Sequence, residues 1–138
     1  MYHYLILTSR RDDFKNFVGG LTQHGEAKEA EVVWEISGEK ALRHIAGGKT
    51  DVAVVDETLP DMTGIEWIRQ AVRINPAVNA VAVSSLSAGD FHEATEGLGV
   101  LFQLPVHPDK DQAREVVNRL EKIGLHLRTP GPAAERSR

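Results

Sequence analysis

The feature that most constrains the fold is an alternation, five times over, of a short apolar run with a segment of helical periodicity. The runs are too uniformly apolar to have one exposed face, which is typical of strands covered on both sides. Parallel strands need crossover connections, and the helices of those crossovers cover the sheet. The predicted strands are residues 3–8, 31–36, 51–55, 79–83 and 100–104.

Right-handed crossovers leave few compact arrangements for five such units. The commonest is the doubly wound α/β fold, a five-stranded parallel sheet of flavodoxin-like order 2-1-3-4-5 with helices on both faces. Its ligand crevice lies at the carboxyl ends of strands one and three. In this chain those ends carry Thr8, Ser9 and Asp56. We therefore expect a functional site at this edge of the sheet.

The segments between the strands are predicted to be helices, because their apolar residues recur at spacings of three and four. Ser9 and Ser37 are expected N-caps, and Asp12 adds an acidic third position after Ser9. Trp34 is expected at the edge of the core, and Trp67 partly exposed at a contact surface. The inward residues are predicted to be Phe14, Phe17, Val18 and Leu21; Ala41, Leu42 and Ile45; Ile65, Ile68, Ala71 and Val72; Phe91 and Ala94; and Ala113, Val116, Val117, Leu120 and Ile123.

Length and charge set the broad class. The 138 residues suit one domain, expected over residues 1–126, with residues 127–138 a disordered tail or the start of a linker. The net charge is −4 and the basic residues are scattered, which argues against nucleic-acid binding. No apolar run approaches the ~20 residues of a membrane span. The amino-terminal segment is too short and too soon charged for a signal peptide, so a cytoplasmic protein is expected.

Several kinds of site are excluded by residue type or spacing. The chain has no cysteine, so it can form neither a disulfide nor a thiolate nucleophile. Its six histidines show no metal-ligand spacing. No glycine-rich phosphate loop follows the first strand, and no serine nucleophile elbow is present. We predict no catalytic residues and no enzyme activity, and the pattern leaves the identity of any metal unknown.

The most specific segment is residues 51–64, DVAVVDETLPDMTG, in which an apolar strand runs into Asp56 and a loop with a proline and a glycine. This segment resembles the third-strand signature of response-regulator receiver domains, the CheY-like family. The landmarks Ser84 and Pro105 agree with it, and the resemblance extends over about residues 2–125. The chain is similar to a receiver domain of two-component or phosphorelay signalling.

The resemblance implies a role for each matching residue. Asp56 stands at the position of the phosphoacceptor, which attacks a phosphohistidine or a small phosphodonor. In the family, Mg²⁺ relieves the repulsion between this carboxylate and the phosphoryl group, held in part by a loop carbonyl that falls on Thr58. Ser84 matches the switch hydroxyl that grips phosphoryl oxygens. The implied partner is a sensor histidine kinase or another signalling protein.

Other positions depart from the family pattern. The acidic metal-binding pair falls on Thr8 and Ser9, and the lysine position falls on Leu104. The switch aromatic falls on Leu101, and its neighbour Phe102 should point to the opposite face of the sheet. Two hydroxyls in place of two carboxylates remove most of the charge that would recruit Mg²⁺, so this cofactor is doubtful. The missing lysine costs a charge-assisted hydrogen bond worth about 1.5–3 kcal/mol. These departures indicate an atypical receiver or pseudo-receiver.

Nearby charges offer two routes of compensation. Asp12 and Asp13 are acidic and close to the lost pair, although capping the first helix is their expected role. Arg10 and Arg11 suggest another route, in which one guanidinium reaches Asp56 and replaces the positive charge of the metal. The alternative is a pair of solvated arginines near a loop. Asp56 itself has a structural alternative as a turn-capping residue.

Three functions of different classes remain open on sequence alone. The first is a phosphorylatable receiver that shifts between two states. The second is a phosphorylation-independent pseudo-receiver acting as a protein–protein interaction module, and the third a flavodoxin-like enzyme using the same crevice. Oligomeric state is open as well, a homodimer through the last two helices being one alternative. The sequence is compatible with a stand-alone regulator and with one domain of a longer protein.

Overall fold

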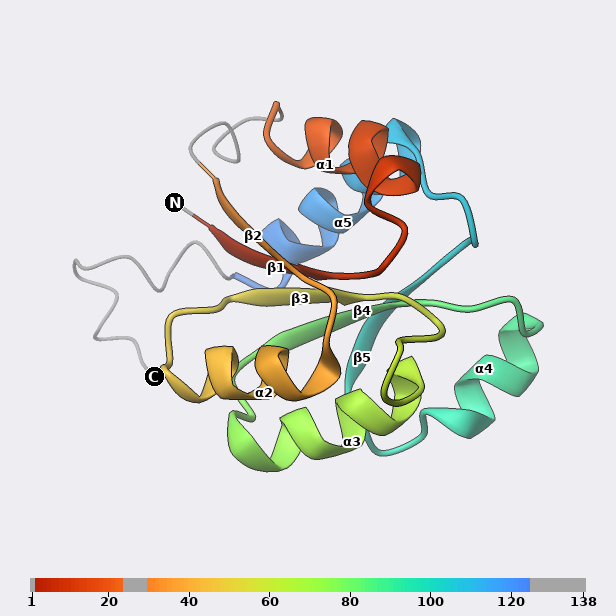
Figure 1. The fold of residues 1–138 in the computed structure, drawn as a ribbon. Coiled ribbons are helices and arrows are strands. Elements are labelled where there is room, and N and C mark those ends of the chain that lie inside the picture. Colours follow the sequence, from red (N-terminus) through yellow and green to blue (C-terminus); the bar gives the residue numbers. More distant parts are fainter. Residues whose placement is uncertain (1, 24–29, 125–138) are drawn as a thin grey trace.

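A computed structural model describes residues 2–23 and 30–124 and shows a five-stranded parallel sheet of order β2-β1-β3-β4-β5 (Figure 1). The predicted fold class and strand order are confirmed. The predicted tail, residues 127–138, lies outside the described residues. The strands are β1 (His3–Leu7), β2 (Glu31–Glu35), β3 (Val52–Val55), β4 (Asn79–Val83) and β5 (Val100–Leu104). The helices are η1 (Arg11–Phe14), α1 (Lys15–Leu21), α2 (Gly38–Ala46), α3 (Gly64–Ile74), α4 (Ala88–Ala94) and α5 (Lys110–Lys122).

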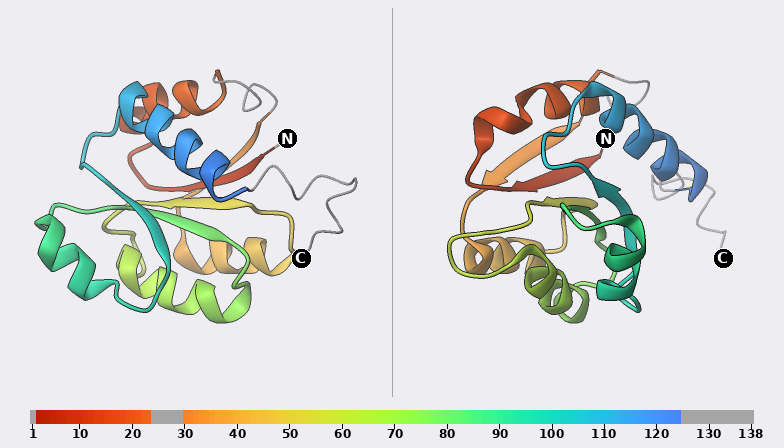
Figure 2. Two further views of the ribbon diagram at one scale, coloured as in Figure 1. Left: turned by 180° about the vertical axis from the view of Figure 1, so that it is seen from behind. Right: turned by 90° about the vertical axis from the view of Figure 1, so that its right-hand side faces the viewer.

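The helices form a layer on each face of the sheet, with α1 and α5 on one face and α2, α3 and α4 on the other (Figures 1 and 2). Each layer covers its own apolar core. Along β1, Tyr4 and Ile6 belong to the core under α1 and α5, whereas Leu5 and Leu7 belong to the core under α2 and α3. Because successive strand residues point to opposite faces, a strand buried on both faces must be apolar throughout. This is the physical reason for the uniform runs in the sequence.

The start of the first helix differs from the prediction. A 3₁₀ turn, η1, precedes α1, and its cap position is occupied by Arg10 without a side-chain cap hydrogen bond, so the prediction of a Ser9 N-cap is wrong. Asp12 and Asp13 lie in the first turn of η1, where acidic residues complement the helix dipole, but no side-chain cap hydrogen bond forms there. Asp12 instead pairs with Lys15 at 3.2 Å, and Asp13 pairs with Arg10 at 3.2 Å. At the first turn the Arg10 side chain therefore pairs with Asp13, and no polar side chain caps the helix.

Trp67 and Ile123 also lie elsewhere than expected. Trp67 is fully buried, and its indole Nε1–H donates to the carbonyl oxygen of Gly38 at 2.9 Å. The prediction that Trp67 is partly exposed is wrong, because α2 packs over it and supplies a partner for its one polar group. Ile123 follows the last residue of α5 and is 54% exposed, so it does not continue the buried face of that helix.

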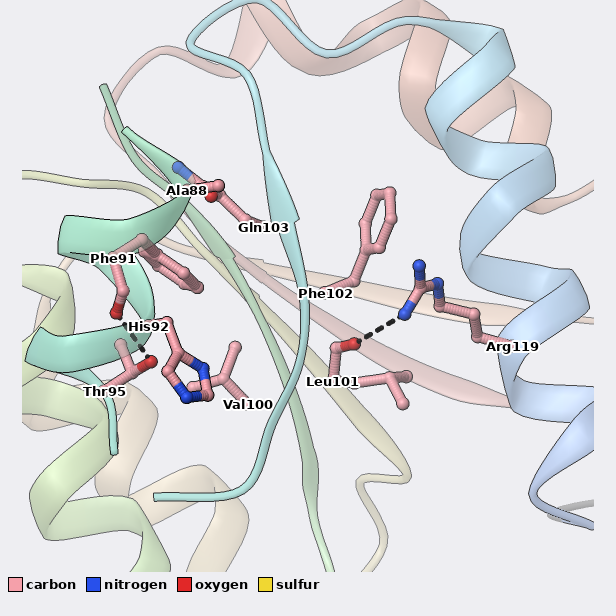
Figure 3. A pocket seen from close by; sticks show the side chains of 9 residues that line it. All are labelled: Ala88, Phe91, His92, Thr95, Val100, Leu101, Phe102, Gln103 and Arg119. Atoms are coloured by element: carbon pink, nitrogen blue, oxygen red, sulfur yellow. Dashed lines mark hydrogen bonds between the residues drawn. The ribbon is translucent and has the colours of Figure 1, made fainter. Parts of the chain in front are cut away.

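A β-bulge in β5 overturns a further expectation. The register with β4 shifts between Ala80 and Val81, which pair with Val100 and Phe102 and leave Leu101 as the extra residue. A bulge interrupts the alternation of faces. Leu101 and Phe102 consequently both pack against the core under α1 and α5, and Figure 3 shows both side chains on the α5 side of the strand. The prediction that Phe102 points to the opposite face from Leu101 is wrong.

Candidate functional site

Asp56 lies directly after β3, at the carboxyl edge of the sheet and beside the end of β1. Its backbone N–H donates to the carbonyl oxygen of Leu7 at 2.9 Å, which continues the β1–β3 ladder by one residue. The side chain is almost entirely buried, with the residue 3% exposed. A buried carboxylate is costly unless donors compensate it, so its surroundings decide its chemistry.

The Asp56 carboxylate receives four hydrogen bonds. Oδ2 accepts from the hydroxyl of Thr8 at 2.6 Å and from Nε of Arg10 at 2.9 Å. Oδ1 accepts from Nη2 of Arg10 at 3.0 Å and from the backbone N–H of Glu57 at 2.8 Å. A carboxylate offers about four lone-pair sites. All the acceptor capacity of Asp56 is therefore used within the protein.

Arg10 is held in place by more than Asp56. Its guanidinium grips both oxygens of that carboxylate, pairs with Asp13, and donates from Nη2 to the carbonyl oxygen of Val106 at 2.9 Å. It also lies 5.4 Å from the centroid of the Phe14 ring. The side chain is 29% exposed, so water reaches only part of the guanidinium. A two-point hydrogen-bonded contact between arginine and a carboxylate fixes the relative orientation of the two groups in addition to pairing their charges.

The adjacent Arg11 serves a different contact. Its guanidinium stacks on the half-buried Trp34 ring, 4.5 Å from the ring centroid. The two arginines considered as charge substitutes are thus separated by the structure. Arg10 makes the contact with Asp56 that the sequence suggests for one of them, and Arg11 packs on Trp34 of β2.

The pKa of Asp56 reflects a competition between burial and hydrogen bonding. Burial raises the pKa of this carboxyl group, but the hydrogen bonds from Arg10, Thr8 and the Glu57 amide, with the positive charge of Arg10, hold the pKa below its ordinary value. The hydrogen bond to Asp56 is in turn the main cause that raises the pKa of Arg10. Both groups are charged at neutral pH.

The other residues singled out by sequence lie around this pair. Thr8 is buried and donates to Asp56, whereas Ser9 is exposed and lines an open hollow over Asp56 together with Thr58 and Val106. Leu104 is buried in the core under α1 and α5. The hydroxyl oxygen of Ser84 accepts from the backbone N–H of Leu86 at 3.1 Å, which is the loop-satisfying role open to a strand-end serine.

Two neighbouring carboxylates have roles that the sequence did not reveal. Asp61 accepts hydrogen bonds at the start of α2 from the backbone N–H groups of Gly38 at 2.9 Å and Glu39 at 3.1 Å. These bonds lower the pKa of Asp61. The side chain of Glu57 reaches Ser85 on the loop after β4. The neighbours of Asp61 and Glu57 in the sequence, Pro60 and Asp56, do not indicate that these side chains bind such distant segments.

Comparison with known proteins shows which fold the chain shares. A response regulator receiver protein of Anaeromyxobacter sp. (strain Fw109-5) is 30% identical over 105 residues, which are 76% of this chain and 42% of that protein. The heme response regulator HssR of Staphylococcus haemolyticus is 40% identical over 55 residues, or 40% of this chain and 24% of that protein. A CheY-like receiver domain of Methanospirillum hungatei JF-1 superposes with a TM-score of 0.74 at 17% identity, covering 91% of this chain and 98% of that one.

The chain has the fold of a CheY-like receiver domain. No protein-family model matches it. The chain spans less than half the length of the two curated relatives. Among the described residues, no helix is long and apolar enough to cross a membrane. These residues also contain no group of three or more histidine, aspartate or glutamate side chains placed to hold a metal ion.

Proposed function

We propose that this receiver domain is a phosphorylation-independent protein–protein interaction module, held in one state by the Arg10–Asp56 pair. The partner would be a signalling protein of a two-component pathway, a sensor histidine kinase among the candidates. The observation that carries the proposal is the saturation of the Asp56 carboxylate, whose four hydrogen bonds come from Thr8, Arg10 and Glu57.

A saturated carboxylate is a poor nucleophile. To attack phosphorus, an oxygen of Asp56 must present a lone pair, and each one is engaged by a donor. Releasing Oδ1 or Oδ2 would break part of a two-point contact with Arg10. The charged hydrogen bonds of such a contact are worth about 1.5–3 kcal/mol each. This cost adds to the barrier of phosphoryl transfer.

The donor set around Asp56 does not fit Mg²⁺. The ion prefers oxygen ligands, carboxylates above all. Here the neighbouring strand-end residues are Thr8, whose hydroxyl already donates to Asp56, and the exposed Ser9. The Arg10 cation lies within hydrogen-bonding distance of both Asp56 oxygens and would repel a second cation at that place. We therefore assign no metal-dependent step to this domain.

A second candidate is a phosphorylatable receiver. It is favoured by one observation, the open hollow above Asp56 lined by Ser9, Arg10, Glu57 and Thr58, through which a small phosphodonor could approach. For that function Arg10 would have to swing away and a different charge would have to stabilise the phosphoryl group. The two candidates predict opposite responses to a phosphoryl mimic.

Amide NMR spectra recorded with Mg²⁺ and then with beryllofluoride test the proposal. We expect spectra unchanged within error at millimolar Mg²⁺ and mimic, because Arg10 already occupies the carboxylate. Shifts centred on Asp56, Ser9 and Ser84 that are absent from Asp56→Asn would contradict the proposal and support the phosphorylatable receiver.

A rebuilt variant provides the positive control. Replacing Thr8 and Ser9 with aspartate, Arg10 with alanine and Leu104 with lysine supplies the acidic pair and the lysine that the family pattern calls for. We expect this variant to respond to beryllofluoride at the loops around Asp56. Its folding should be checked first by the dispersion of the amide spectrum, since Leu104 is buried.

A further inference from the structure

The Glu57 side chain connects the Asp56 site to the loop between β4 and α4. One carboxylate oxygen, Oε2, accepts from the backbone N–H of Ser85 at 2.9 Å and from its hydroxyl at 2.8 Å. Glu57 is half-buried and Ser85 exposed, and Glu57 also lines the hollow over Asp56. Because both donors of Ser85 bind the same Glu57 oxygen, the contact fixes the position of Ser85.

Glu57 is itself positioned by Asp56. Its backbone N–H donates to Oδ1 of Asp56, and its carbonyl oxygen accepts from the N–H of Gly64 at 2.9 Å. A continuous set of contacts therefore runs from Arg10 through Asp56 and Glu57 to Ser85. Gly64 permits the tight approach, since a Cβ at that position would collide with the carbonyl oxygen of Asp56.

The β4–α4 loop, residues 84–87, is determined by side-chain contacts along its length. Ser84 accepts from the N–H of Leu86, and the Leu86 carbonyl accepts from the side-chain amide of Gln103 at 2.9 Å. Ser87 then caps α4 by accepting from the N–H of Asp90. Ser85, in contrast, donates to a carboxylate, the side chain of Glu57, which follows Asp56 directly in the chain.

We propose that Glu57 is a positioning residue, whose side chain is a built-in hydrogen-bond acceptor that holds the β4–α4 loop and the start of α4 in one conformation. A phosphoryl group on Asp56 would bring acceptor oxygens to this edge of the sheet, and the Glu57 carboxylate already provides an acceptor for the loop there. This inference rests on the proposed function, because a loop held from within needs no phosphate to order it. The expected result is a single loop state set by Arg10, Asp56 and Glu57 together.

Three substitutions of Glu57 separate acceptor chemistry from packing. Glu57→Gln keeps the length of the side chain and one acceptor oxygen, Glu57→Met keeps the length without an acceptor oxygen, and Glu57→Ala removes both. Amide hydrogen exchange and chemical shifts of residues 84–90 are measured without Mg²⁺ or phosphoryl mimic. We expect Glu57→Met and Glu57→Ala to raise the exchange rate of the Ser85 amide at least tenfold and to shift the loop amides, with Glu57→Gln close to the wild type.

Matched controls make the outcome decisive. Glu93→Gln neutralises an exposed carboxylate on α4 and should leave Ser85 unchanged. Arg10→Ala should loosen Ser85 through Asp56, whereas Arg11→Ala should not. The proposal is overturned if Glu57→Met protects Ser85 as well as the wild type does, or if the loop shifts are the same in all variants. A beryllofluoride response in the wild type would contradict the proposed function. The hydrogen-exchange rates of Ser85 would still test the role of Glu57 independently.

Discussion

At the scale of the residue, Asp56 shows that the reactivity of a carboxylate is set by the donors around it. The group is buried, yet it keeps its charge because a guanidinium, a hydroxyl and a backbone amide all donate to it. Removing one partner of such a pair leaves the other buried and unpaired, which costs more than the pair contributes. Arg10 is therefore the residue whose loss should be felt most at this site.

Replacing Arg10 with glutamine is expected to lower the free energy of unfolding by about 2–4 kcal/mol at pH 7, because the Asp56 carboxylate loses its cation. Breaking a fully buried ion pair typically costs about 3–5 kcal/mol. The loss expected here is somewhat smaller, because the Arg10 guanidinium is partly exposed to solvent. Urea denaturation followed by circular dichroism measures the change.

Arg11→Gln is the matched control. It removes a guanidinium stacked on Trp34, and a loss of only about 0.5–1 kcal/mol is expected. Adding Asp56→Asn to Arg10→Gln should restore part of the stability, because the uncompensated charge is then gone. Equal losses at Arg10 and Arg11 would show that the Asp56 contact contributes nothing special.

At the scale of the element, the packing of α1 against α5 requires one of two adjacent glycines in α1, Gly20 but not Gly19. A Cβ on Gly20 would lie 2.8 Å from the Cβ of Ala113, closer than two carbons can approach. Gly20 therefore allows the two helices to meet backbone to backbone. At Gly19 a Cβ would meet nothing within 4 Å, so this glycine only lowers the propensity of the helix.

Alanine substitutions at these two positions should act in opposite directions. Gly19→Ala is expected to stabilise the domain by about 0.5–1 kcal/mol by reducing the freedom of the unfolded chain. Gly20→Ala is expected to destabilise it by about 1–3 kcal/mol through overpacking against Ala113. Thermal unfolding of both variants gives the comparison, and a change of the same sign in both would refute this account of the α1–α5 contact.

At the scale of the whole molecule, the site exists only when the sheet is assembled. Arg10 follows β1, Asp56 follows β3 and Val106 follows β5, and the guanidinium bonds to both of the other segments. Parallel strands carry their following loops to one edge, so residues 46 and 96 positions away along the chain meet at Arg10. Unfolding breaks these contacts together, which links the protonation of Asp56 to global stability.

This linkage predicts a specific loss of stability in acid. The folded pKa of Asp56 lies below its ordinary value of 3.8, so its stabilising contribution is complete above that value and is lost as pH falls through the folded pKa. Asp61 contributes in the same direction, because the Gly38 and Glu39 amides lower its pKa. Urea unfolding between pH 2 and 7 should show a steeper acid loss in the wild type than in Asp56→Asn. Parallel pH profiles for the two proteins would contradict it.

Local patterns in the sequence were sufficient for the elements and their order. Apolar runs and helical spacings depend on residues close in the chain, and right-handed crossovers then restrict the arrangement of the sheet. The same reasoning placed Asp56, Thr8 and Ser9 at one edge. It also supplied Arg10 and Arg11 as candidate cations, but without a means of choosing between them.

The tertiary structure alone decided which side chains meet. Arg10 and Arg11 are adjacent in the chain, yet Arg10 binds Asp56 and Arg11 stacks on Trp34. Which arginine makes which contact depends on the direction of η1 relative to β1. The burial of Trp67 and the Asp61 and Glu57 contacts join segments at least 22 residues apart. The bulge at Leu101 is likewise a property of the β4–β5 pairing. Sequence determines elements because their periodicity is local, whereas a site between loops depends on distances that only the closed fold sets.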